Sequence, residues 1–477
     1  MSNSTYELLQ PLFHPRSIAL AGIKIADPEH WTRTFLDSLL EFEFEGQIFL
    51  VNPRGGEFHG LEVYRSFEDI PHAVDYVIST VPAQAAPGLV EECAAKGVKV
   101  VHFCTAGFGE IDEEEGTRLE AELVEISQRT GIRIMGPNCM GIYCPQSRLS
   151  FGAVFPKESG SVGFISQSGG NAGTLVREAT CRGIRFSSVI SYGNACDLNE
   201  TDFLEYLTAD PGTEIIALYV EGVKDAKRFR QALEKAVKEK PVILLKGGVT
   251  QGGARAAAGH TGALAGPGVT WESLCKQLGI IQVCSLEELT DTLVTLLFMP
   301  IPKGRNAALI GVGGGNSVLI ADDFEKRKLK VPLLPAETRN RIREFTPIAG
   351  NILRNPIDYG QTMFDTQKVI KTVDIVSHCE LIDFLVGFFS LGPAPQYMRS
   401  QMCEMVDGML QASKAGSKPM AVIITSSIVP EEAREIFPVI EELISLQLPV
   451  YFSFANAATA ISLVLSYNET RLSRLRT

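Results

Sequence analysis

The chain has 477 residues, of which 45% are hydrophobic and 21% are charged, so it is not an intrinsically disordered protein, and about two to four folded domains are expected. Its 44 basic and 56 acidic residues give a net charge of −12. This excess of acid argues against a nucleic acid as the main partner, while a local basic pocket for one phosphate-bearing ligand stays compatible with it.

The amino-terminal stretch MSNSTYELLQPLFHP has neither a basic start nor an apolar core, so no secretory signal is expected there. No apolar run approaches the ~20 residues that a membrane-spanning helix needs. The 10 cysteines are scattered without a CxxC pair and are interpreted as reduced thiols. The closest pair, Cys139 and Cys144, lacks two further ligands, so no metal site is expected. A cytoplasmic protein without a membrane partner is predicted.

The first part of the chain alternates short runs rich in β-branched and aromatic residues with helical patterns, which predicts a parallel sheet. The runs are SIALAG, QIFLVNP, DYVISTVP, VKVVHFCTAG and IRIMGPN. Ligands of open α/β sheets bind beyond the carboxyl ends of the strands, so the turns after these runs are expected to line one crevice. The turns contain Gly22, Asn52-Pro53-Arg54, Val81-Pro82-Ala83, Thr105-Ala106-Gly107 and Gly136-Pro137-Asn138-Cys139.

Two further series of the same kind follow. The second contains the predicted strands SVGFIS, FSSVIS, IIALYVEG and PVILLKGG, and the third contains AALIGVGGG, IDFLVGFFS, PMAVIITSS and LPVYFSF. A proline-rich stretch at 300–304 separates them like a linker. The predicted fold class is therefore α/β, with three tandem domains at 1–145, 146–300 and 301–477.

The sequence Ser166-Gln167-Ser168-Gly169-Gly170 follows a predicted strand and opens a predicted helix. Free backbone N–H groups and two hydroxyls at a helix start can hold an anion. The same residues can equally form a helix cap and a tight turn, because serine is a preferred N-cap. Spacing alone does not decide between these two interpretations.

Glu221 and Lys246 each close a predicted apolar strand. A carboxylate at the end of a strand can orient a neighbouring imidazole and set its tautomer. The alternative is an exposed charge at the end of a strand, which is the more common situation for glutamate.

His260 lies in the run ARAAAGHTGALAG, which has no bulky side chain on either side of it. It could be a metal ligand, a general base, a nucleophile that carries a group, or a structural loop histidine. The second series contains no other histidine that could complete a metal site, which disfavours a metal ligand. For a general base, the sequence does not identify the substrate proton that His260 would remove. The predicted helix ALAGPGVTWESLCKQLG starts just after His260, and its dipole would favour a phosphoryl group on the imidazole. The stretch Gly311 to Asn316 is a weaker anion-site candidate, because it lacks the third glycine of a dinucleotide fingerprint.

Taken together, these motifs resemble the α-subunit arrangement of the NDP-forming acyl-CoA synthetases, relatives of succinyl-CoA synthetase that include ADP-forming acetyl-CoA synthetase. The resemblance is carried by VNPR (51–54), GPNCMGIYCP (136–145), SVGFISQSGG (161–170), YVEGVKD (219–225), ARAAAGHTGALAG (254–266) and NPIDYG (355–360). It implies a Rossmann-like CoA-binding domain followed by two flavodoxin-like domains of the succinyl-CoA synthetase kind.

The resemblance also implies an activity, in which an acyl-CoA, ADP and phosphate are interconverted with a carboxylic acid, CoA and ATP through an acyl phosphate and a phosphohistidine. His260 matches the phosphorylated histidine, and Glu221 matches the carboxylate that holds its imidazole. Ser166, Ser168, Gly169 and Gly170 match the groups that receive the phosphate.

By the same resemblance, coenzyme A contacts are expected in the first domain and near the reacting thioester. The matching residues are Gly22, Lys24, Asn52, Pro53, Arg54, Val81, Pro82, Ala83, Thr105, Ala106, Gly107, Asn138 and Cys139. The loop after the first strand reads AGIKIADPEHW and departs from the glycine-rich pattern of the family. Relatives that run the full reaction also use an ATP-grasp module for ATP or ADP and Mg²⁺, which implies a β subunit here and a heterotetramer. The alternative is a CoA or acyl-CoA sensor or assembly protein without ligase activity.

Overall fold

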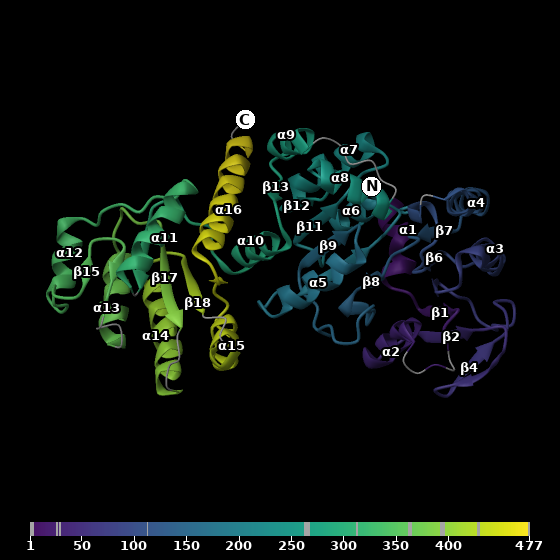
Figure 1. The fold of residues 1–477 in the computed structure, drawn as a ribbon, viewed down its shortest axis with the longest axis horizontal. Coiled ribbons are helices and arrows are strands. Elements are labelled where there is room, and N and C mark those ends of the chain that lie inside the picture. The colour runs from purple at the N-terminus through teal and green to yellow at the C-terminus, as the bar shows by residue number, and fades with distance from the viewer. Residues whose placement is uncertain are drawn as a thin grey trace. The chain divides into compact units, whose positions relative to one another are not determined.

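The structure is a computed structural model that describes residues 4–24, 27, 30–111, 113–261, 268–311, 313–360, 365–391, 396–426 and 430–475. The chain forms two compact units, Met1–Thr180 with Arg185–Leu286 and Cys181–Ile184 with Glu287–Thr477, and each is described by itself (Figure 1). The first unit contains two sheets and the second contains one.

The first sheet has the strand order β3-β4-β2-β1-β5-β6-β7 and is parallel except for the β3–β4 hairpin. Without β3, this is the 3-2-1-4-5-6 order of Rossmann folds, whose ligand crevice lies between the first and fourth strands, here β1 and β5. The strands are β1 (Ser17–Ala21), β2 (Gln47–Val51), β3 (Gly56–Phe58), β4 (Leu61–Tyr64), β5 (Tyr76–Ser79), β6 (Val100–Phe103) and β7 (Arg133–Met135). The helices are α1 (Ser4–Phe13), η1 (Trp31–Arg33), α2 (Thr34–Glu41), η2 (Ala83–Ala85), α3 (Ala86–Lys96), η3 (Gly109–Ile111) and α4 (Glu114–Thr130).

The second sheet has the order β13-β12-β11-β9-β10-β8, in which only β8 is antiparallel to its neighbour. The five parallel strands follow the 2-1-3-4-5 order of flavodoxin-like folds, so the crevice is expected between β9 and β11. The strands are β8 (Gly141–Tyr143), β9 (Val162–Ser166), β10 (Phe186–Ser191), β11 (Ile215–Val220), β12 (Val242–Lys246) and β13 (Ile281–Val283). The helices are η4 (Pro145–Ser147), α5 (Gly169–Thr180), α6 (Glu200–Ala209), α7 (Ala226–Glu239), α8 (Gln251–Thr261) and α9 (Gly268–Leu278).

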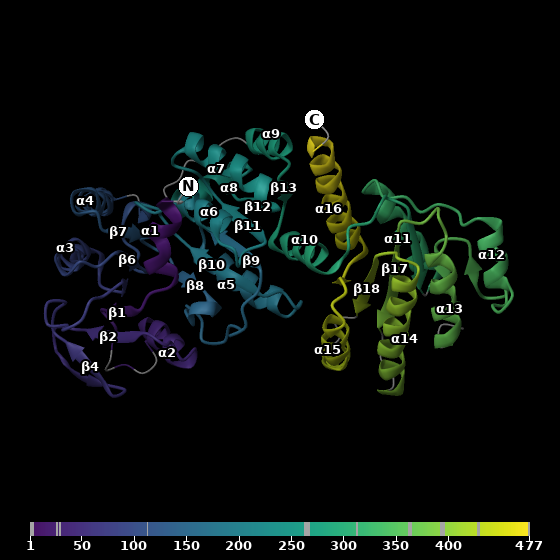
Figure 2. The ribbon, with the colours of Figure 1, turned by 180° about the vertical axis from the view of Figure 1, so that it is seen from behind.

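The sheet of the second unit has the order β15-β16-β14-β17-β18-β19 and repeats the flavodoxin-like order. Helices α11 and α16 lie side by side in this unit (Figure 1 and Figure 2). The strands are β14 (Ala307–Gly311), β15 (Ile352–Leu353), β16 (Ile357–Asp358), β17 (Phe384–Leu391), β18 (Met420–Ser426) and β19 (Val450–Tyr451). The helices are α10 (Leu286–Phe298), α11 (Gly314–Lys326), α12 (Ala336–Arg343), α13 (Thr366–Ser377), α14 (Gln396–Ala415), α15 (Pro430–Ser445) and α16 (Phe454–Leu475).

The α/β class, the Rossmann-like first domain and the two flavodoxin-like domains are confirmed, and every run named above as a strand contains one. Six short strands were not predicted from the sequence, namely β3, β4, β8, β13, β15 and β16. Each of these strands has at most four residues, and an alternating pattern cannot be recognised over so short a stretch. The domain boundaries at 145 and 300 stay predictions.

One expectation about His260 was wrong. The helix expected just after it, α9, begins at Gly268, and His260 lies in the last turn of α8. Alanine is the best helix former, and the alanine-rich run before His260 therefore continues the helix that starts at Gln251. The end of α8 that contains His260 has the negative pole of the helix dipole, so the dipole argument for a phosphoryl group does not apply to this helix.

Within the described part of the chain, no helix is long and apolar enough to cross a membrane. All ten cysteines belong to this part, and none of them forms a disulfide bond there.

Candidate functional site

The turn between β9 and α5 lies at the switch point of the second sheet. Ser166 ends β9, and its hydroxyl donates to the main-chain oxygen of Ser168 at 2.7 Å. The Ser168 hydroxyl accepts the N–H of Asn171 at 3.3 Å, so Ser168 does form a helix cap. A Cβ atom on Gly169 would come within 2.7 Å of the Met140 side chain, so a larger residue there would force Met140 to move. The cap is therefore present, and the phosphate site at the same turn stays a prediction.

Glu221 lies on the other side of this switch point, directly after β11. It is only 4% exposed, so the interpretation as an exposed charge was wrong. The hydroxyl of Tyr219 donates to Glu221 Oε1 at 2.9 Å, and this contact orients the carboxylate. Burial, followed by the charge of Glu221, raises the pKa of Tyr219, so the phenol keeps its proton for this hydrogen bond.

Gln167 connects the two turns, and the sequence analysis did not give it a role. Its side chain is nearly buried, and its amide oxygen accepts the main-chain N–H groups of Glu221 at 2.8 Å and of Gly222 at 3.2 Å. The hydroxyl of Tyr192 lies 3.4 Å from the same oxygen. Gln167 thus fixes the position of Glu221 relative to Ser166 and Ser168. Its place between the two serines was the available sequence signal.

Helix α8 follows the next strand of the sheet, β12. Thr250 precedes the helix, and its hydroxyl accepts the N–H of Gly253 at 3.1 Å. His260 is the last residue but one of α8, and its side chain lies outside the described residues. The helix lies against η3, which belongs to the turn after β6 of the first sheet. His260 therefore belongs to the same compact unit as the turns of the first and second sheets.

The crevice of the first sheet brings together part of the predicted coenzyme A contacts. Thr80 N–H donates to Ala21 O at 2.9 Å, and a Cβ atom on Gly22 would come within 2.7 Å of Val81 N, so the turns after β1 and β5 are in close contact. Beside them lies a cavity of about 290 Å³. Five predicted residues line it, namely Pro82, Ala83, Thr105, Ala106 and Gly107, together with Gln84, Ile111, Glu113, Glu115 and Gly116.

The other predicted contacts of the first domain lie outside the described lining of this cavity. Asn52 accepts the N–H of Arg54 at 3.1 Å and shapes the turn after β2, in which Pro53 and Arg54 are exposed. Lys24 is exposed as well, and its main-chain N–H donates to the Thr32 hydroxyl at 3.2 Å. The lining also contains Glu113 and Glu115, which were not predicted from the sequence. Their carboxylates favour a neutral part of a ligand over a phosphate there.

The turn that contains Asn138 and Cys139 joins the two sheets. Asn194, after β10, donates its main-chain N–H to Pro137 O at 3.0 Å. A Cβ atom on Gly193 would come within 2.4 Å of Asn138 O, and the φ of Gly193 is +59°, so both space and backbone require glycine. Cys139 is buried, and burial raises the pKa of its thiol well above the usual value. It therefore stays a neutral thiol.

Two carboxylates complete this junction. The side-chain nitrogen of Asn194 donates to Glu110 Oε2 at 2.5 Å and to Glu120 Oε2 at 3.0 Å. Glu110 Oε1 in turn accepts the N–H of Gly107 at 2.5 Å. Asn194 thereby ties the turn after β10 to the cavity lining after β6. The strand that ends at Ser191 was predicted from the sequence, whereas the turn after it was not predicted as part of a site.

The stretch Gly311 to Asn316 is less suited to an anion than the sequence suggested. Asp358 is only 6% exposed, and its carboxylate accepts the N–H of Gly313 at 2.8 Å. It also accepts the N–H of Gly360 at 2.9 Å. A carboxylate of the protein itself therefore lies where an anion would bind.

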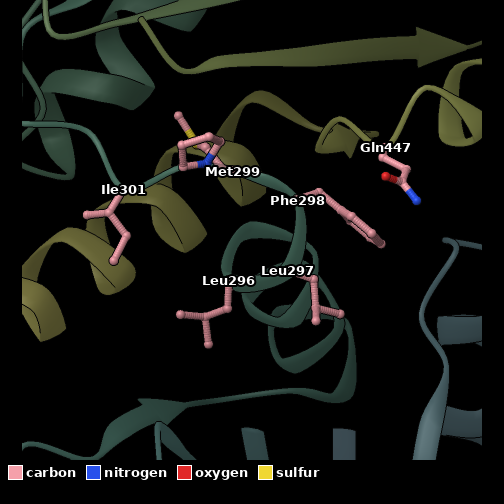
Figure 3. Close-up of a pocket in the computed structure, with 7 residues that line it drawn as sticks. Leu296, Leu297, Phe298, Met299, Ile301 and Gln447 are labelled. Atoms are coloured by element: carbon pink, nitrogen blue, oxygen red, sulfur yellow. The ribbon is translucent and has the colours of Figure 1, made fainter. Parts of the chain in front are cut away.

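The second unit has a cavity of about 520 Å³ at the end of α10 (Figure 3). Its lining consists of Leu296–Ile301 and Gln447, none of which the sequence predicted as a site residue. The described residues include no group of three or more histidine, cysteine, aspartate or glutamate side chains that could hold a metal ion.

Two family models match the chain. A succinyl-CoA ligase like flavodoxin domain matches residues 159–296, and a CoA binding domain matches residues 16–145. These ranges contain the two sheets of the first unit.

Similar proteins cover nearly the whole chain. The α subunit of ADP-forming acetate–CoA ligase II from Pyrococcus furiosus is 36% identical over 431 residues, which are 90% of this chain and 92% of that protein. ADP-forming acetate–CoA ligase I from Archaeoglobus fulgidus is 32% identical over 97% of this chain, but the chain spans only 64% of that longer protein. A solved structure of the dinucleotide-forming acetyl-coenzyme A synthetase 1 of Ca. Korarchaeum cryptofilum, in complex with phosphate and ADP, superposes with a TM-score of 0.82 at 30% identity and covers 98% of both chains.

Proposed function

This chain belongs to the ADP-forming acetate–CoA ligase family of the succinyl-CoA synthetase superfamily, as an α-type ligase subunit, and from that premise we propose that it transfers a phosphoryl group through His260. The reaction converts an acyl-CoA, phosphate and ADP into a carboxylic acid, CoA and ATP, and it is reversible. The acyl group stays open.

The observation that carries this proposal is the geometry around Glu221. The nearly buried carboxylate of Glu221 accepts the Tyr219 hydroxyl, and Gln167 accepts the main-chain N–H of Glu221. Glu221 directly follows β11, which lies between β9 and β12 in the sheet. β12 leads into α8, the helix of His260. A carboxylate beside an imidazole fixes its tautomer and makes the free nitrogen a better nucleophile. A protein that only binds CoA has no use for such an arrangement.

The proposed reaction on this chain has two steps. A phosphate oxygen attacks the thioester carbonyl, the carbon–sulfur bond breaks, and an acyl phosphate and the CoA thiolate are formed. The imidazole of His260 then attacks phosphorus, the bond between phosphorus and the acyl oxygen breaks, and the carboxylic acid leaves as its anion. The hydroxyls of Ser166 and Ser168 and the N–H groups at the start of α5 hold the phosphate oxygens.

Coenzyme A would bind along the crevice of the first sheet. Support comes from the CoA binding domain match and from the cavity beside Pro82 and Thr105. Gly22, Asn52, Pro53, Arg54 and Val81 lie in turns at the same edge of that sheet. Asn138 and Cys139, at the junction of the two sheets, would lie near the thioester. Arg54 is exposed and can give charge-assisted hydrogen bonds to a phosphate of the ligand.

The last step passes the phosphoryl group from His260 to ADP, and we propose that an ATP-grasp β subunit binds this nucleotide with Mg²⁺. The Pyrococcus furiosus relative is designated an α subunit and is matched over 92% of its length, which supports a partner subunit for this chain. An α₂β₂ heterotetramer would follow. His260 would then have to serve two sites, one on each subunit.

The test is phosphorylation of the purified chain. It is incubated with candidate acyl-CoAs and ³²P-phosphate, and acid-labile, base-stable label is mapped by mass spectrometry. Label at His260 that is lost in His260→Ala but kept in His378→Asn, an exposed histidine of the second unit, is expected. If the chain binds CoA but is not labelled with any of the acyl-CoAs, whether or not an ATP-grasp chain is added, the sensor or assembly protein is favoured instead.

A further inference from the structure

Lys246 is a buried lysine beside Glu221 that none of the proposed steps uses. It is the last residue of β12, and it is only 5% exposed. Its register partner on β11 is Val220, so Glu221 and Gly247 are the first residues beyond the two paired strands. The side chain therefore lies where both strands turn away from the sheet.

The ammonium group of Lys246 is held by main-chain oxygens. It donates to Glu221 O at 2.6 Å and also to the oxygen of its neighbour Gly247. The ring of Trp271 lies 5.3 Å from Nζ and covers it from α9. A buried ammonium is costly unless it is hydrogen-bonded, and here the acceptors belong to the two turns that matter for the proposed chemistry.

We infer that Lys246 is a positioning residue for Glu221, because its ammonium group joins the turn that contains the Glu221 carboxylate to the turn that leads into α8. This inference rests on the proposed function, in which Glu221 and His260 act together. Burial lowers the pKa of Lys246, whereas the Glu221 carboxylate raises it, so the two side chains are electrostatically coupled.

Gln167 and Lys246 hold Glu221 from opposite sides of its strand. Gln167, after β9, accepts the main-chain N–H of Glu221, and Lys246, at the end of β12, donates to its main-chain oxygen. Tyr219 holds the carboxylate itself. Without Lys246, one of these three supports is lost, and the carboxylate can shift relative to α8.

The test compares Lys246→Met with Lys240→Met, a matched control. Lys240 precedes β12 at the opposite edge of the sheet, and its ammonium also donates to two main-chain oxygens, those of Leu207 and Asp210, each at 2.6 Å. The rate constant of label transfer to His260 and the apparent KM for the acyl-CoA are measured for both variants. We expect the rate constant of label transfer to fall on the order of 10- to 100-fold in Lys246→Met but not in Lys240→Met, with KM unchanged in both.

Conservative variants separate the roles of the side chain. Lys246→Arg keeps both the charge and the donors and should recover part of the rate, while Lys246→Gln keeps only the donors. If Lys246→Met does not fold, Lys246→Gln takes its place in the comparison. Equal rate losses in the Lys246 and Lys240 variants, or a parental rate in Lys246→Met, would overturn the inference.

Hydrogen exchange provides a readout that does not depend on the reaction. The amides of residues 221–225 and 247–253 should exchange faster in Lys246→Met and stay protected in Lys240→Met. If the parent is not labelled at His260, the proposed function fails, and the exchange pattern alone decides whether Lys246 positions these turns. Unchanged exchange in both segments would overturn the positioning role.

Discussion

The amide oxygen of Gln167 accepts the main-chain N–H of Glu221 at 2.8 Å, although 54 residues separate the two along the chain. This hydrogen bond joins the turn after β9 to the turn after β11. It places the predicted phosphate-binding serines and the predicted carboxylate at one edge of the sheet. A substitution of Gln167 removes this hydrogen bond without changing any residue that is proposed to contact a substrate.

Gln167→Leu leaves the N–H groups of Glu221 and Gly222 without their acceptor in a buried place. We expect the variant to lose about 1–3 kcal/mol of unfolding free energy and on the order of 10- to 100-fold in the rate of His260 labelling. Urea unfolding and labelling kinetics measure the two effects. Tyr192→Phe is the control, because it removes only the weaker 3.4 Å donor and keeps the amide oxygen. A fully active Gln167→Leu would show that Glu221 needs no such support.

Gly247→Ala tests whether Glu221 must stay where it is. A Cβ atom at Gly247 would lie 2.8 Å from the Tyr219 hydroxyl and 3.2 Å from Glu221 Cγ, so the methyl group pushes on both. We expect labelling of His260 to fall on the order of 10- to 100-fold. Gly252→Ala in α8 is the matched control, since its added methyl group meets nothing within 4 Å.

Alanine is a better helix former than glycine, so Gly252→Ala should gain about 0.5–1 kcal/mol of stability and keep its activity. Thermal unfolding with labelling kinetics compares the two variants. Gly247→Ala with parental labelling would contradict a constrained carboxylate at this position.

Glu200, at the start of α6, should make the protein less stable as pH rises. It is 1% exposed, its Oε1 has no hydrogen-bond partner in the described structure, and burial raises its pKa to about 7 from 4.5. The folded state therefore binds a proton that the unfolded state has lost, and this stabilisation is present below pH 4.5 and disappears as pH rises toward 7. Because of Glu200, the unfolding free energy should fall by about 2 kcal/mol between pH 5 and pH 8.

Glu200→Gln does not titrate, so its unfolding free energy should fall less than that of the parent over this pH range. Urea unfolding at a series of pH values measures the difference between the two. Glu214→Gln, at an exposed position, should follow the parent. Parallel pH profiles for the parent and Glu200→Gln would mean that the carboxyl group is ionised in the folded protein at neutral pH.

His102 should have the opposite effect at acidic pH. It is fully buried on β6, where its Nε2 lies 3.0 Å from Cys139 O and its Nδ1 lies 3.0 Å from the Tyr76 hydroxyl. Burial lowers its pKa to about 4 from 6.5, although the Cys139 hydrogen bond raises it. The folded state thus excludes a proton that the unfolded state binds, and stability falls as pH falls from 6.5 toward 4.

Because of His102, the unfolding free energy should fall by about 2 kcal/mol between pH 7 and pH 5. His102→Gln has no titrating group and should have a flatter profile than the parent, whereas exposed His72→Gln should not. Urea unfolding at these pH values compares the three proteins. If His102→Gln loses as much stability on acidification as the parent, His102 does not contribute to it.

The strands and the turns after them could be predicted from the sequence because both signals are local. Runs such as VILLK combine β-branched and apolar residues, and glycine, proline and asparagine mark their ends. The family could be predicted as well, because six motifs occur in a fixed order. The surroundings of His260 were predicted wrongly, since a helix was expected to start just after it, whereas the preceding alanines continue α8 through His260.

The sequence by itself determined three α/β series, the edge at which their turns lie, and the candidates Ser166, Glu221 and His260. Only the tertiary structure decided which turns meet, because the order of strands in a sheet depends on packing between distant segments. The order β12-β11-β9-β10 brings Gln167 and Lys246 to the two sides of Glu221. The packing of the first sheet's elements against those of the second brings Asn194 to Glu110 and Glu120. These residues are polar groups in buried places whose partners are far along the chain, and no local pattern reveals such partners.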